Sequence, residues 1–499
     1  MRSPSRPISS RRRRPVASVL GALALGLAAA GCDRALPPGA VVFTETPASM
    51  GPAPAATDLL EGRYPAGSRV VLAVPPYVPG RLRVLSAGLA AAGDPVVAPD
   101  GRRVFFVAKP VVSAPWQVFV TDVAGSWPRA VTAIPGGAMT PAVIATGELI
   151  FCSPVPKTGP AESNSVPPAI YAQSLGGTPR RLTYGTGEWD PTVLADGRIL
   201  FVATVPAPNQ NGEPRRALFT VNNDGTEIRA FAGQHAGADW LGRPRELGRG
   251  RVGFLAAETE ASARRAWAEA VLAARPFASR ARLFPFATPA CRSVEAEAGG
   301  VMLVCCESRG VVGRSMRGVS AIFRVSPGAL ALPPPMFEET SWDAVEATPV
   351  APHPPPMGHL STMVAGKRTG IVLCLDANRS TVSLAPPAGD ATATAVRVVA
   401  RVGPDTVTVL GQVPVQPDGS FLVEVPADTL LGFETIDAAG RSLRREAPSL
   451  WVRPGENRTC IGCHAPHNHS PPNHRPLAVD LPLARLGPST PVLAQAKGK

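Results

Sequence analysis

The sequence predicts an all-β protein in which a β-propeller is followed by a small β-sandwich and a short C-terminal segment. Three observations support this fold class. The chain is rich in proline and glycine (57 and 48 of 499 residues) and only 18% of it is charged, which favours many short strands over long helices. A strand–turn–strand pattern repeats through the middle of the chain. Near Lys367 the repeated pattern ends, and the sequence that follows predicts a different set of short strands.

The length of 499 residues is typical of two or three domains rather than one. Changes in composition along the chain divide it into five predicted parts. They are a signal peptide at 1–31, a Pro/Ala-rich tether at 32–58, a propeller of about six blades at 59–360, a sandwich at 361–455, and a motif-bearing segment with a Pro- and His-rich tail at 456–499.

The first residues have the features of an export signal. Four arginines, Arg11–Arg14, precede the apolar run Val16–Ala30, which is shorter than the ~20 residues that a membrane-spanning helix needs. The text Ala29-Ala30-Gly31-Cys32 resembles the lipobox of bacterial lipoproteins, in which the cysteine becomes the lipidated N-terminus. The resemblance implies lipid attachment at Cys32 on the periplasmic side of the envelope, and we expect the outer membrane. Ordinary cleavage that leaves Cys32 unmodified is the alternative.

The formal net charge of +12 is unevenly placed along the chain. Six arginines lie within the signal peptide, and the others form no stripe with interleaved aromatic side chains. We therefore expect no nucleic-acid partner. The membrane, reached through the lipid anchor, is an expected partner.

The repeated text of the middle region predicts propeller blades. The sequence of Asp94–Ala108 predicts a strand, a turn and a second strand, and Asp190–Ala203 has nearly the same sequence. Weaker copies begin at Thr140 and Arg243, so that the starts lie about 50 residues apart, the length of one blade. The pattern x-Asp-Pro-x-x-x-Pro-Asp-Gly resembles the TolB-type propeller repeat. The resemblance implies a scaffold or binding platform and names no activity.

Two further predictions complete the fold. The Ala-rich stretch Glu260–Ala274 contains good helix formers and is expected to be a helical insertion. After Lys367, short apolar runs separated by Gly-containing turns predict a β-sandwich. The expected strands are Thr369–Asp376, Val396–Val402, Val407–Val413, Phe421–Val425 and Phe433–Ile436.

The segment Cys460-Ile461-Gly462-Cys463-His464 has the pattern of a c-type haem attachment site. Two thiols at this spacing bond to the two vinyl groups on one edge of haem, and the histidine that follows then lies beneath the iron. We expect one haem c on Cys460 and Cys463, with His464 as the proximal iron ligand. A disulfide between the two cysteines, or half of a zinc site, is the alternative.

Further histidines gather around this motif and in the upstream Pro-rich loop 351–359. They offer a distal iron ligand or a ligand to a second metal. The candidates are His469, His474, His353, Met357 and His359. His467 is too close to His464 in sequence to reach the opposite face of the ring, and an iron with an open sixth position is the alternative.

The remaining cysteines fall into two groups. Cys152 and Cys374 lie in apolar strands and are expected to be buried, inert thiols. Cys305 and Cys306 are adjacent, so their side chains point to opposite faces of a strand. Either one could form a disulfide with Cys291 in an oxidising compartment, and the sequence leaves the choice open.

Several short sequence motifs lie between about residues 345 and 480. They are Val350–Pro356, Lys367–Gly370, Val413–Phe421, Val425–Thr429, Asp437–Arg441 and Val452–His464. Together they resemble the haem-bearing middle domain of the hydrazine synthase alpha-subunit family, which in many exported bacterial proteins follows a propeller. The resemblance implies this architecture for residues 60–480.

In that family the motif histidine binds zinc and a tyrosine shortly after it ligates the iron. The resemblance implies that His464 could bind zinc instead of iron, which makes zinc a second candidate cofactor. This chain departs from the family in having no tyrosine after Tyr184, with Asn468 at the corresponding place. No second Cys-x-x-Cys-His follows His464. We therefore do not expect this chain to join nitric oxide and ammonium into hydrazine.

These features predict a lipid-anchored, mono-haem cytochrome-like protein. It would transfer electrons with an unidentified redox partner protein or sense redox state, with the propeller as docking platform. One alternative is a haem-dependent redox enzyme that acts on a small nitrogen compound or another small molecule. A second alternative is a haem-free binding lipoprotein with zinc or a disulfide at the Cys-x-x-Cys. No catalytic residue is assigned.

Overall fold

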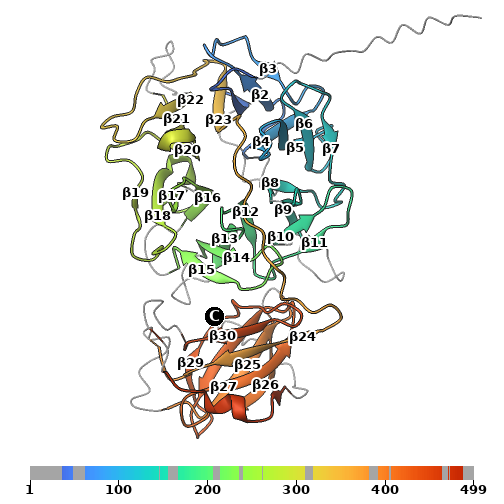
Figure 1. Ribbon diagram of the computed structural model, residues 1–499, viewed down its shortest axis with the longest axis vertical. Coiled ribbons are helices and arrows are strands. Elements are labelled where there is room, and N and C mark those ends of the chain that lie inside the picture. The colour runs from blue at the N-terminus through green and yellow to red at the C-terminus, as the bar shows by residue number, and fades with distance from the viewer. Residues whose placement is uncertain are drawn as a thin grey trace, which may run out of the picture. The chain divides into compact units, whose positions relative to one another are not determined.

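The computed structural model describes residues 36–48, 62–144, 146–155, 167–205, 214–234, 240–260, 262–308, 319–380, 392–403, 406–463, 470 and 473–486. Strands dominate these residues, and the all-β prediction is confirmed (Figure 1). The helical elements among them are three short 3-10 helices, η1 (Ala263–Arg265), η2 (Ala298–Gly300) and η3 (Leu477–Asp480). Within the described ranges no helix has the length and apolarity that a membrane crossing requires.

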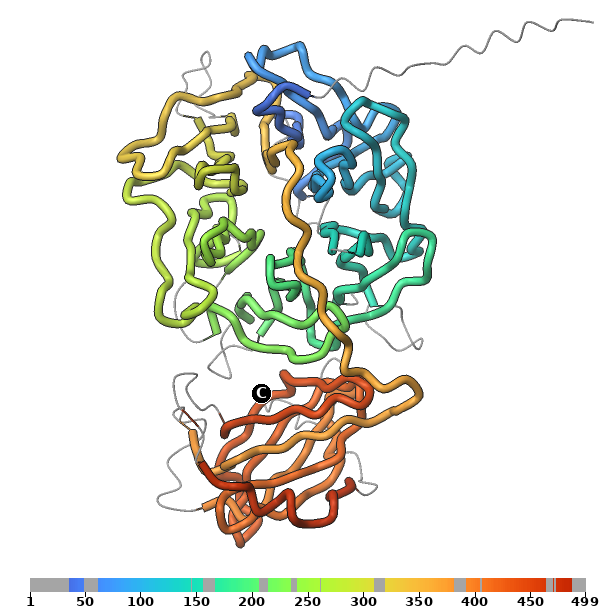
Figure 2. The backbone as a smooth tube through the Cα atoms, in the orientation of Figure 1, coloured from blue at the N-terminus to red at the C-terminus, as the bar shows by residue number. Residues whose placement is uncertain are grey.

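Antiparallel sheets arranged in a ring form the propeller (Figures 1 and 2). We number the blades in chain order, with the innermost strand first. Blade 1 consists of β23 (Trp342–Pro349), β1 (Val41–Pro47), β2 (Arg69–Ala73) and β3 (Arg83–Val84). Blade 2 consists of β4 (Ala91–Val97), β5 (Arg103–Lys109), β6 (Gln117–Asp122) and β7 (Arg129–Ala130). Blade 3 consists of β8 (Met139–Val143), β9 (Leu149–Pro154), β10 (Pro168–Gln173) and β11 (Arg180–Arg181).

The second half of the ring repeats this order. Blade 4 consists of β12 (Glu188–Val193), β13 (Ile199–Val205), β14 (Arg215–Val221) and β15 (Arg229–Ala232). Blade 5 consists of β16 (Trp240–Glu246), β17 (Arg251–Ala257), β18 (Trp267–Leu272) and β19 (Ala281–Arg282). Blade 6 has three strands among the described residues, β20 (Cys291–Ala296), β21 (Met302–Glu307) and β22 (Ser320–Val325).

Blade 1 closes the ring with strands from both ends of the propeller. β1 pairs with β2 on one side and with β23 on the other. The expected tether at 32–58 is therefore wrong for residues 41–47, which form a propeller strand. The physical reason is that Val41–Phe43 are fully buried, and this apolar run gains more from a central strand position than from solvent.

The repeated text marks a bulge in the innermost strand of several blades. Asp94, Thr140, Asp190 and Arg243 have positive φ values of 55°, 48°, 46° and 49°, and the strand register shifts beside each of them. A bulge inserts an extra residue and turns its side chain out of the regular alternation. The Asp-Pro of the repeat thus aims a side chain at the propeller axis.

The second strand of each repeat supplies the packing between blades. Phe105, Phe151, Phe201 and Phe254 occupy this strand in blades 2 to 5 and are all fully buried. Each buried phenylalanine contributes about 1.5–3 kcal/mol relative to an exposed one. Each of these repeats therefore specifies one bulge in its first strand and one buried phenylalanine in its second strand.

The predicted helix at 260–274 is wrong. Residues 267–272 form β18, the third strand of blade 5, preceded by the short η1. Pairing with β17 along Arg251–Ala256 gives this segment hydrogen bonds and buries Ala268 and Val271. Tertiary pairing therefore overrides the helix propensity of its alanines.

Two four-stranded sheets form the sandwich. One sheet has the order β30-β24-β27-β31 and the other β26-β25-β28-β29. Their strands are β24 (Thr369–Cys374), β25 (Ala395–Arg401), β26 (Val407–Pro414), β27 (Phe421–Pro426), β28 (Leu431–Ile436), β29 (Ser442–Arg445), β30 (Asn457–Cys460) and β31 (Ala484–Arg485). The predicted sandwich is confirmed, but its boundary at 455 is wrong, because β30 and β31 belong to it.

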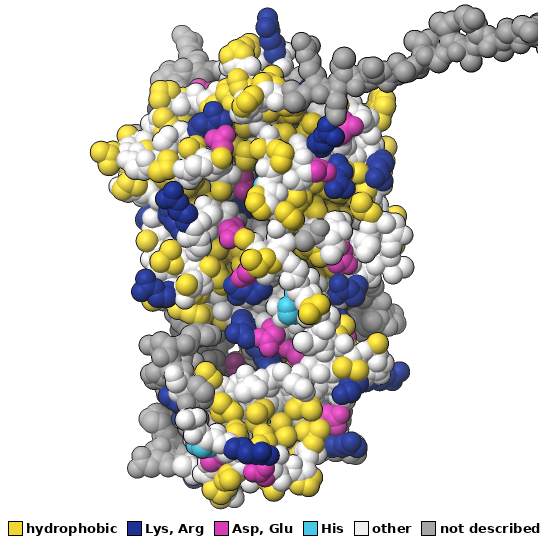
Figure 3. All heavy atoms as spheres, viewed as in Figure 1, with side chains coloured by type: hydrophobic (Ala, Val, Ile, Leu, Met, Phe, Trp, Pro, Cys, Tyr) yellow, Lys and Arg dark blue, Asp and Glu magenta, His cyan; other side chains and the backbone are white. Residues whose placement is uncertain are grey.

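A Pro-rich strap, residues 350–364, leads from β23 across the propeller face to the sandwich (Figure 2). The hairpin turns of the repeats hold it. The N–H of His353 donates to the Pro99 carbonyl (3.1 Å), and that of Met357 donates to the Ala195 carbonyl (2.8 Å). On this face Lys and Arg side chains are scattered among acidic and apolar ones (Figure 3).

Candidate functional site

The Cys-x-x-Cys turn directly follows an edge strand of the sandwich. Cys460 is the last residue of β30, and Ile461 to Cys463 form the turn after it. β30 runs parallel to β24, and the register of this pair sets Cys460 opposite Cys374. Both cysteines of the motif are half-buried. The turn is thus held by the sheet through the edge strand β30.

Cys374 brings a third thiol to the motif. Its side chain is buried, as predicted, and it is hydrogen-bonded to Cys463. This hydrogen bond, together with burial, raises the pKa of Cys374, and burial raises the pKa of Cys460. No local pattern in the sequence marks this grouping, because only the parallel pairing of β24 and β30 brings these distant segments together.

The turn packs closely on the loop that follows β24. A Cβ on Gly462 would lie 2.7 Å from the carbonyl oxygen of Arg379 and 2.9 Å from that of Asp376. Glycine permits this approach of two backbones. The N–H of Leu375 donates to the Cys460 carbonyl at 2.9 Å, which continues the pairing into the motif. The position of the two thiols is therefore set by backbone contacts.

The predicted metal ligands of the tail lie mostly outside the described residues. These are His464 and His469, and the lipidation candidate Cys32 lies outside them as well. His474 is described; its ring is exposed, with Nδ1 3.2 Å from the Arg475 carbonyl oxygen. Among the described His, Cys, Asp and Glu side chains, no group of three or more is arranged to hold a metal ion. The ligand roles stay predictions.

The candidate ligands upstream of the sandwich lie on the strap. The ring of His353 has Nε2 3.4 Å from the Val97 carbonyl oxygen and Nδ1 3.2 Å from that of Pro354. Met357 is 70% exposed, and His359 is exposed. The described hydrogen bonds of His353 and Met357 thus join them to the propeller and the strap itself, rather than to the Cys-x-x-Cys turn.

Contacts with blade 4 hold the strand that carries the motif. Glu456, the residue before β30, accepts hydrogen bonds from the N–H groups of Glu227 (2.9 Å) and Arg453 (2.8 Å). Within β30, Arg458 donates to the carbonyl oxygen of Ile228. Glu456 is 2% exposed, and burial raises its pKa. A buried carboxylate with two backbone donors positions β30, a role that the sequence did not indicate.

Trp451 supplies the apolar part of the same contact. Its indole Nε1 donates to the Gly225 carbonyl oxygen (3.2 Å), and its ring lies 6.4 Å from that of Tyr184, between centroids. The side chain is 2% exposed. A buried tryptophan with a satisfied N–H combines a large apolar contact with a defined orientation.

Glu188, at the start of β12, has a pKa raised to about 7 by burial. Because the ordinary value is 4.5, the folded state binds a proton more tightly than the unfolded state between about pH 4.5 and 7. The free energy of unfolding is expected to fall by about 3 kcal/mol across this window as pH rises. Urea unfolding at about pH 5 and pH 8 measures the change, and Glu188→Gln is expected to flatten it. An equal slope in both proteins would refute this assignment.

The propeller axis holds a buried network of charges. Arg63 forms two hydrogen bonds with Asp190, at 2.8 and 3.0 Å, and Arg243 forms an ion pair with Glu346. Tyr64 donates its hydroxyl hydrogen to Glu346. Burial alone would raise the pKa of Asp190, but Arg63 holds it well below its usual range. The charges are paired with one another, so this network is structural.

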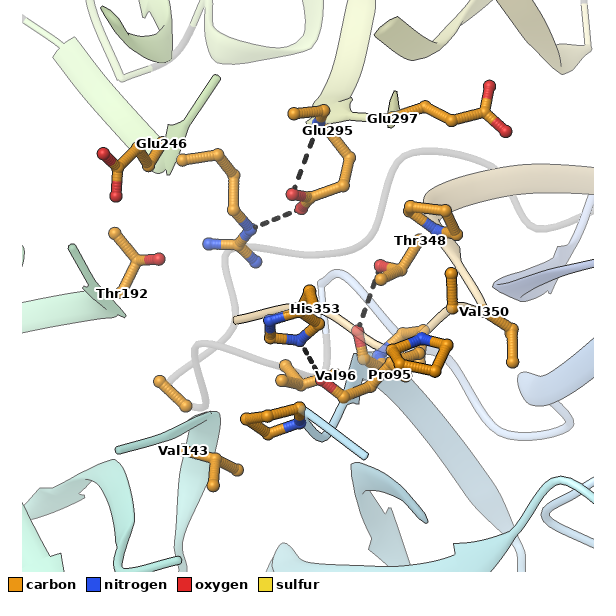
Figure 4. A pocket seen from close by; sticks show the side chains of 18 of the residues that line it. Pro95, Val96, Val143, Thr192, Glu246, Glu295, Glu297, Thr348, Val350 and His353 are labelled. Carbon is orange, nitrogen blue, oxygen red and sulfur yellow. Dashed lines mark hydrogen bonds and ion pairs between the residues drawn. The ribbon is translucent and has the colours of Figure 1, made fainter. Parts of the chain in front are cut away.

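Above this network lies a cavity of about 690 Å³, roofed by the strap. Its walls are the bulged ends of the innermost strands, including Pro95 and Thr192 (Figure 4). Arg245 contacts Glu295 at 3.1 Å, and the ring of His353 lies near the same carboxylate. Burial raises the pKa of Glu295, an effect that Arg245 opposes. A cavity of this size with apolar walls and a few charged groups can hold a small molecule.

The segment that carries the thiols also matches a known family. Residues 374–465 match the hydrazine synthase alpha subunit middle domain. This range begins at Cys374, the last residue of β24, and contains β25 to β30 and the whole motif. The predicted resemblance is thereby confirmed for the hydrazine synthase-like domain. The matched range includes β30, the strand that ends at Cys460.

Solved structures extend the similarity to the propeller. Hydrazine synthase from Kuenenia stuttgartiensis is 18% identical, with 89% of this chain and 72% of that chain covered and a TM-score of 0.77. At this identity the match shows a shared fold. TolB from Acinetobacter baumannii is 11% identical, with 62% and 66% covered and a TM-score of 0.41. No curated protein sequence matches the chain.

Proposed function

We propose that the chain is an exported, lipid-anchored protein that carries one haem c and works in electron transfer or redox sensing. One observation carries the proposal. The Cys-x-x-Cys-His motif lies in a segment that matches the hydrazine synthase alpha subunit middle domain, and its cysteines follow β30, an edge strand of the sandwich. The export signal and Cys32 support placement on the periplasmic side of the envelope, where haem c is attached.

The residues of the motif fit such a group. Cys460 and Cys463 are half-buried on one turn, and β30 is an edge strand, so no further strand of its sheet covers the turn. Haem held there would supply a one-electron redox centre. Thioether bonds at the two cysteines would hold the ring, while Glu456 and Gly462 keep the turn in place. His464 is the proposed proximal ligand, to iron or, as the resemblance implies, to zinc.

The propeller would act as the docking platform for a redox partner protein. Glu456, Arg458 and Trp451 tie the motif-bearing strand to blade 4. A partner that binds the propeller would therefore meet the redox centre in a fixed orientation. Preorganised placement of this kind favours specific docking.

An absorption spectrum tests the proposal. Protein matured with the haem-attachment machinery is expected to keep a Soret band after denaturation and acid–acetone extraction, because thioether bonds survive both. Loss of the band on extraction would show that haem is absent or only loosely bound. The haem-free alternative, with zinc or a disulfide at the Cys-x-x-Cys, would then be the better description.

The cavity beneath the strap favours a second candidate function, a redox enzyme or binding protein for a small molecule. Its walls combine prolines and valines with Arg245, Glu295 and His353. Carbon monoxide separates the two candidates. Electron transfer predicts a reduced spectrum that carbon monoxide leaves unchanged, because protein side chains would occupy both ligand positions of the iron, whereas an iron with an open position would give a shift.

A further inference from the structure

Two cysteines face one another in blade 6, far in sequence from the Cys-x-x-Cys motif. Cys291 is the first residue of β20, and Cys306 lies near the end of β21. The strand register places them directly opposite, and their sulfur atoms are 3.1 Å apart. Both are buried, at 1% and 0% exposure. Two thiols at this separation need only a small change in side-chain torsion to reach bonding distance, about 2.0 Å.

The backbone pairing around them suits a cross-strand bond. The N–H of Glu307 donates to the Ala290 carbonyl oxygen (3.0 Å), while the N–H of Cys291 donates away from β21, to Ala266 (2.8 Å). Cys291 and Cys306 are therefore a pair that exchanges no backbone hydrogen bond. Such pairs have the closest Cα atoms in an antiparallel sheet, about 4.5 Å apart, which lies within the range of disulfides.

The neighbouring thiol of Cys305 points the other way. It packs in a separate cluster with Leu303 and Ile322, and its partner across the strands is Ser293. Cys306 instead shares its cluster with Cys291. The alternation of side chains along β21 thus decides the pairing that the sequence left open.

We propose that Cys291 and Cys306 form a disulfide in the exported protein. Each thiol gives up its proton, one S–S bond forms, and the two electrons pass to a disulfide of a thiol oxidoreductase in the export compartment, which becomes a dithiol. The hydrogen bond from Cys306 lowers the pKa of Cys291, which favours Cys291 as the attacking thiolate.

The bond would stabilise a strand that supports the propeller axis. Ser293 of β20 accepts a hydrogen bond from the N–H of Glu346 (2.9 Å), and Glu295 of the same strand lines the cavity. Blade 6 has three strands in the described part of the chain, whereas the other blades have four. A covalent link between β20 and β21 would strengthen this three-stranded sheet, which lies next to blade 1 in the ring.

Peptide mapping of the wild-type protein tests the proposal without depending on a variant that folds. Periplasmic protein is alkylated without reduction and digested with trypsin, which cleaves after Arg282, Arg292 and Arg309. We expect peptides 283–292 and 293–309 to be linked through Cys306, with Cys305 alkylated, and to separate on reduction. Alkylation of both Cys291 and Cys306, or a link from Cys291 to Cys305, would overturn the proposal.

Matched variants measure the consequence. Cys291→Ser and Cys306→Ser are each expected to lower the Tm by about 5 °C and to remove its dependence on reductant. Cys305→Ser replaces the adjacent buried thiol and is expected to keep both the link and the reductant dependence. If reductant leaves the Tm of the linked wild-type protein unchanged, the stabilising role is wrong.

Discussion

Replacing Cys460 and Cys463 together by alanine is expected to abolish covalently bound haem. The two thiols are the attachment points of the proposed thioether bonds. No other cysteine in the printed sequence belongs to a Cys-x-x-Cys-His motif that could replace them. The expected change is complete, from one haem per chain to none. Haem staining of a denaturing gel and the mass of the intact protein measure it. A variant with one cysteine left is expected to retain part of the haem through a single bond.

The control is Cys152→Ala, which removes a fully buried thiol from β9 in blade 3. It is expected to keep its haem, because Cys152 lies in the propeller core rather than in the motif. Covalent haem that persists in the double variant, with normal yield in the control, would contradict attachment at Cys460 and Cys463.

Replacing Arg243 by methionine is expected to lower the free energy of unfolding by about 3–5 kcal/mol. Arg243 is ion-paired with Glu346 on the propeller axis, where the Glu346 side chain is 3% exposed. Burial alone would raise the pKa of Glu346, and Arg243 holds it below its usual value. Without the guanidinium, Glu346 would be a buried carboxylate that keeps its hydrogen bonds with Tyr64 and Thr44 and a weaker attraction to Arg63, but no ion pair of its own. Urea unfolding measures the loss.

Arg198→Met is the matched control. Arg198 pairs with Asp196 at 2.6 Å in the exposed turn between β12 and β13, with side chains 32% and 48% exposed. Removal of this exposed pair is expected to change the free energy of unfolding by less than about 1 kcal/mol. Equal losses in the two variants would show that the axial network contributes no more than a surface ion pair.

The repeats made most of the propeller predictable, because each Asp-Pro copy encodes one bulge, one hairpin turn and one buried phenylalanine. Prediction failed where local sequence and tertiary pairing disagree. Residues 260–274 have helix-forming alanines, yet β17 offers a strand partner, so β18 forms. Val41–Pro47 lies in Pro/Ala-rich text, yet β23 from the far end of the propeller pairs with it.

The candidate site divides in the same way. The motif at Cys460 and Cys463 is local, so its spacing alone indicated the chemistry. Cys374, Glu456 and Trp451 act through contacts with segments distant in the chain, and no local pattern marks them.

By itself, the sequence determined the fold class, the repeated blade and the position of the paired thiols, because these depend on periodicity and on residues within a few positions of one another. The tertiary structure alone decided that Cys306 rather than Cys305 faces Cys291, that Cys374 joins the motif, and that Asp190 of the repeat pairs with Arg63 at the axis. The physical reason is that strand register joins residues far apart in the chain, and a shift of one residue turns every side chain to the other face.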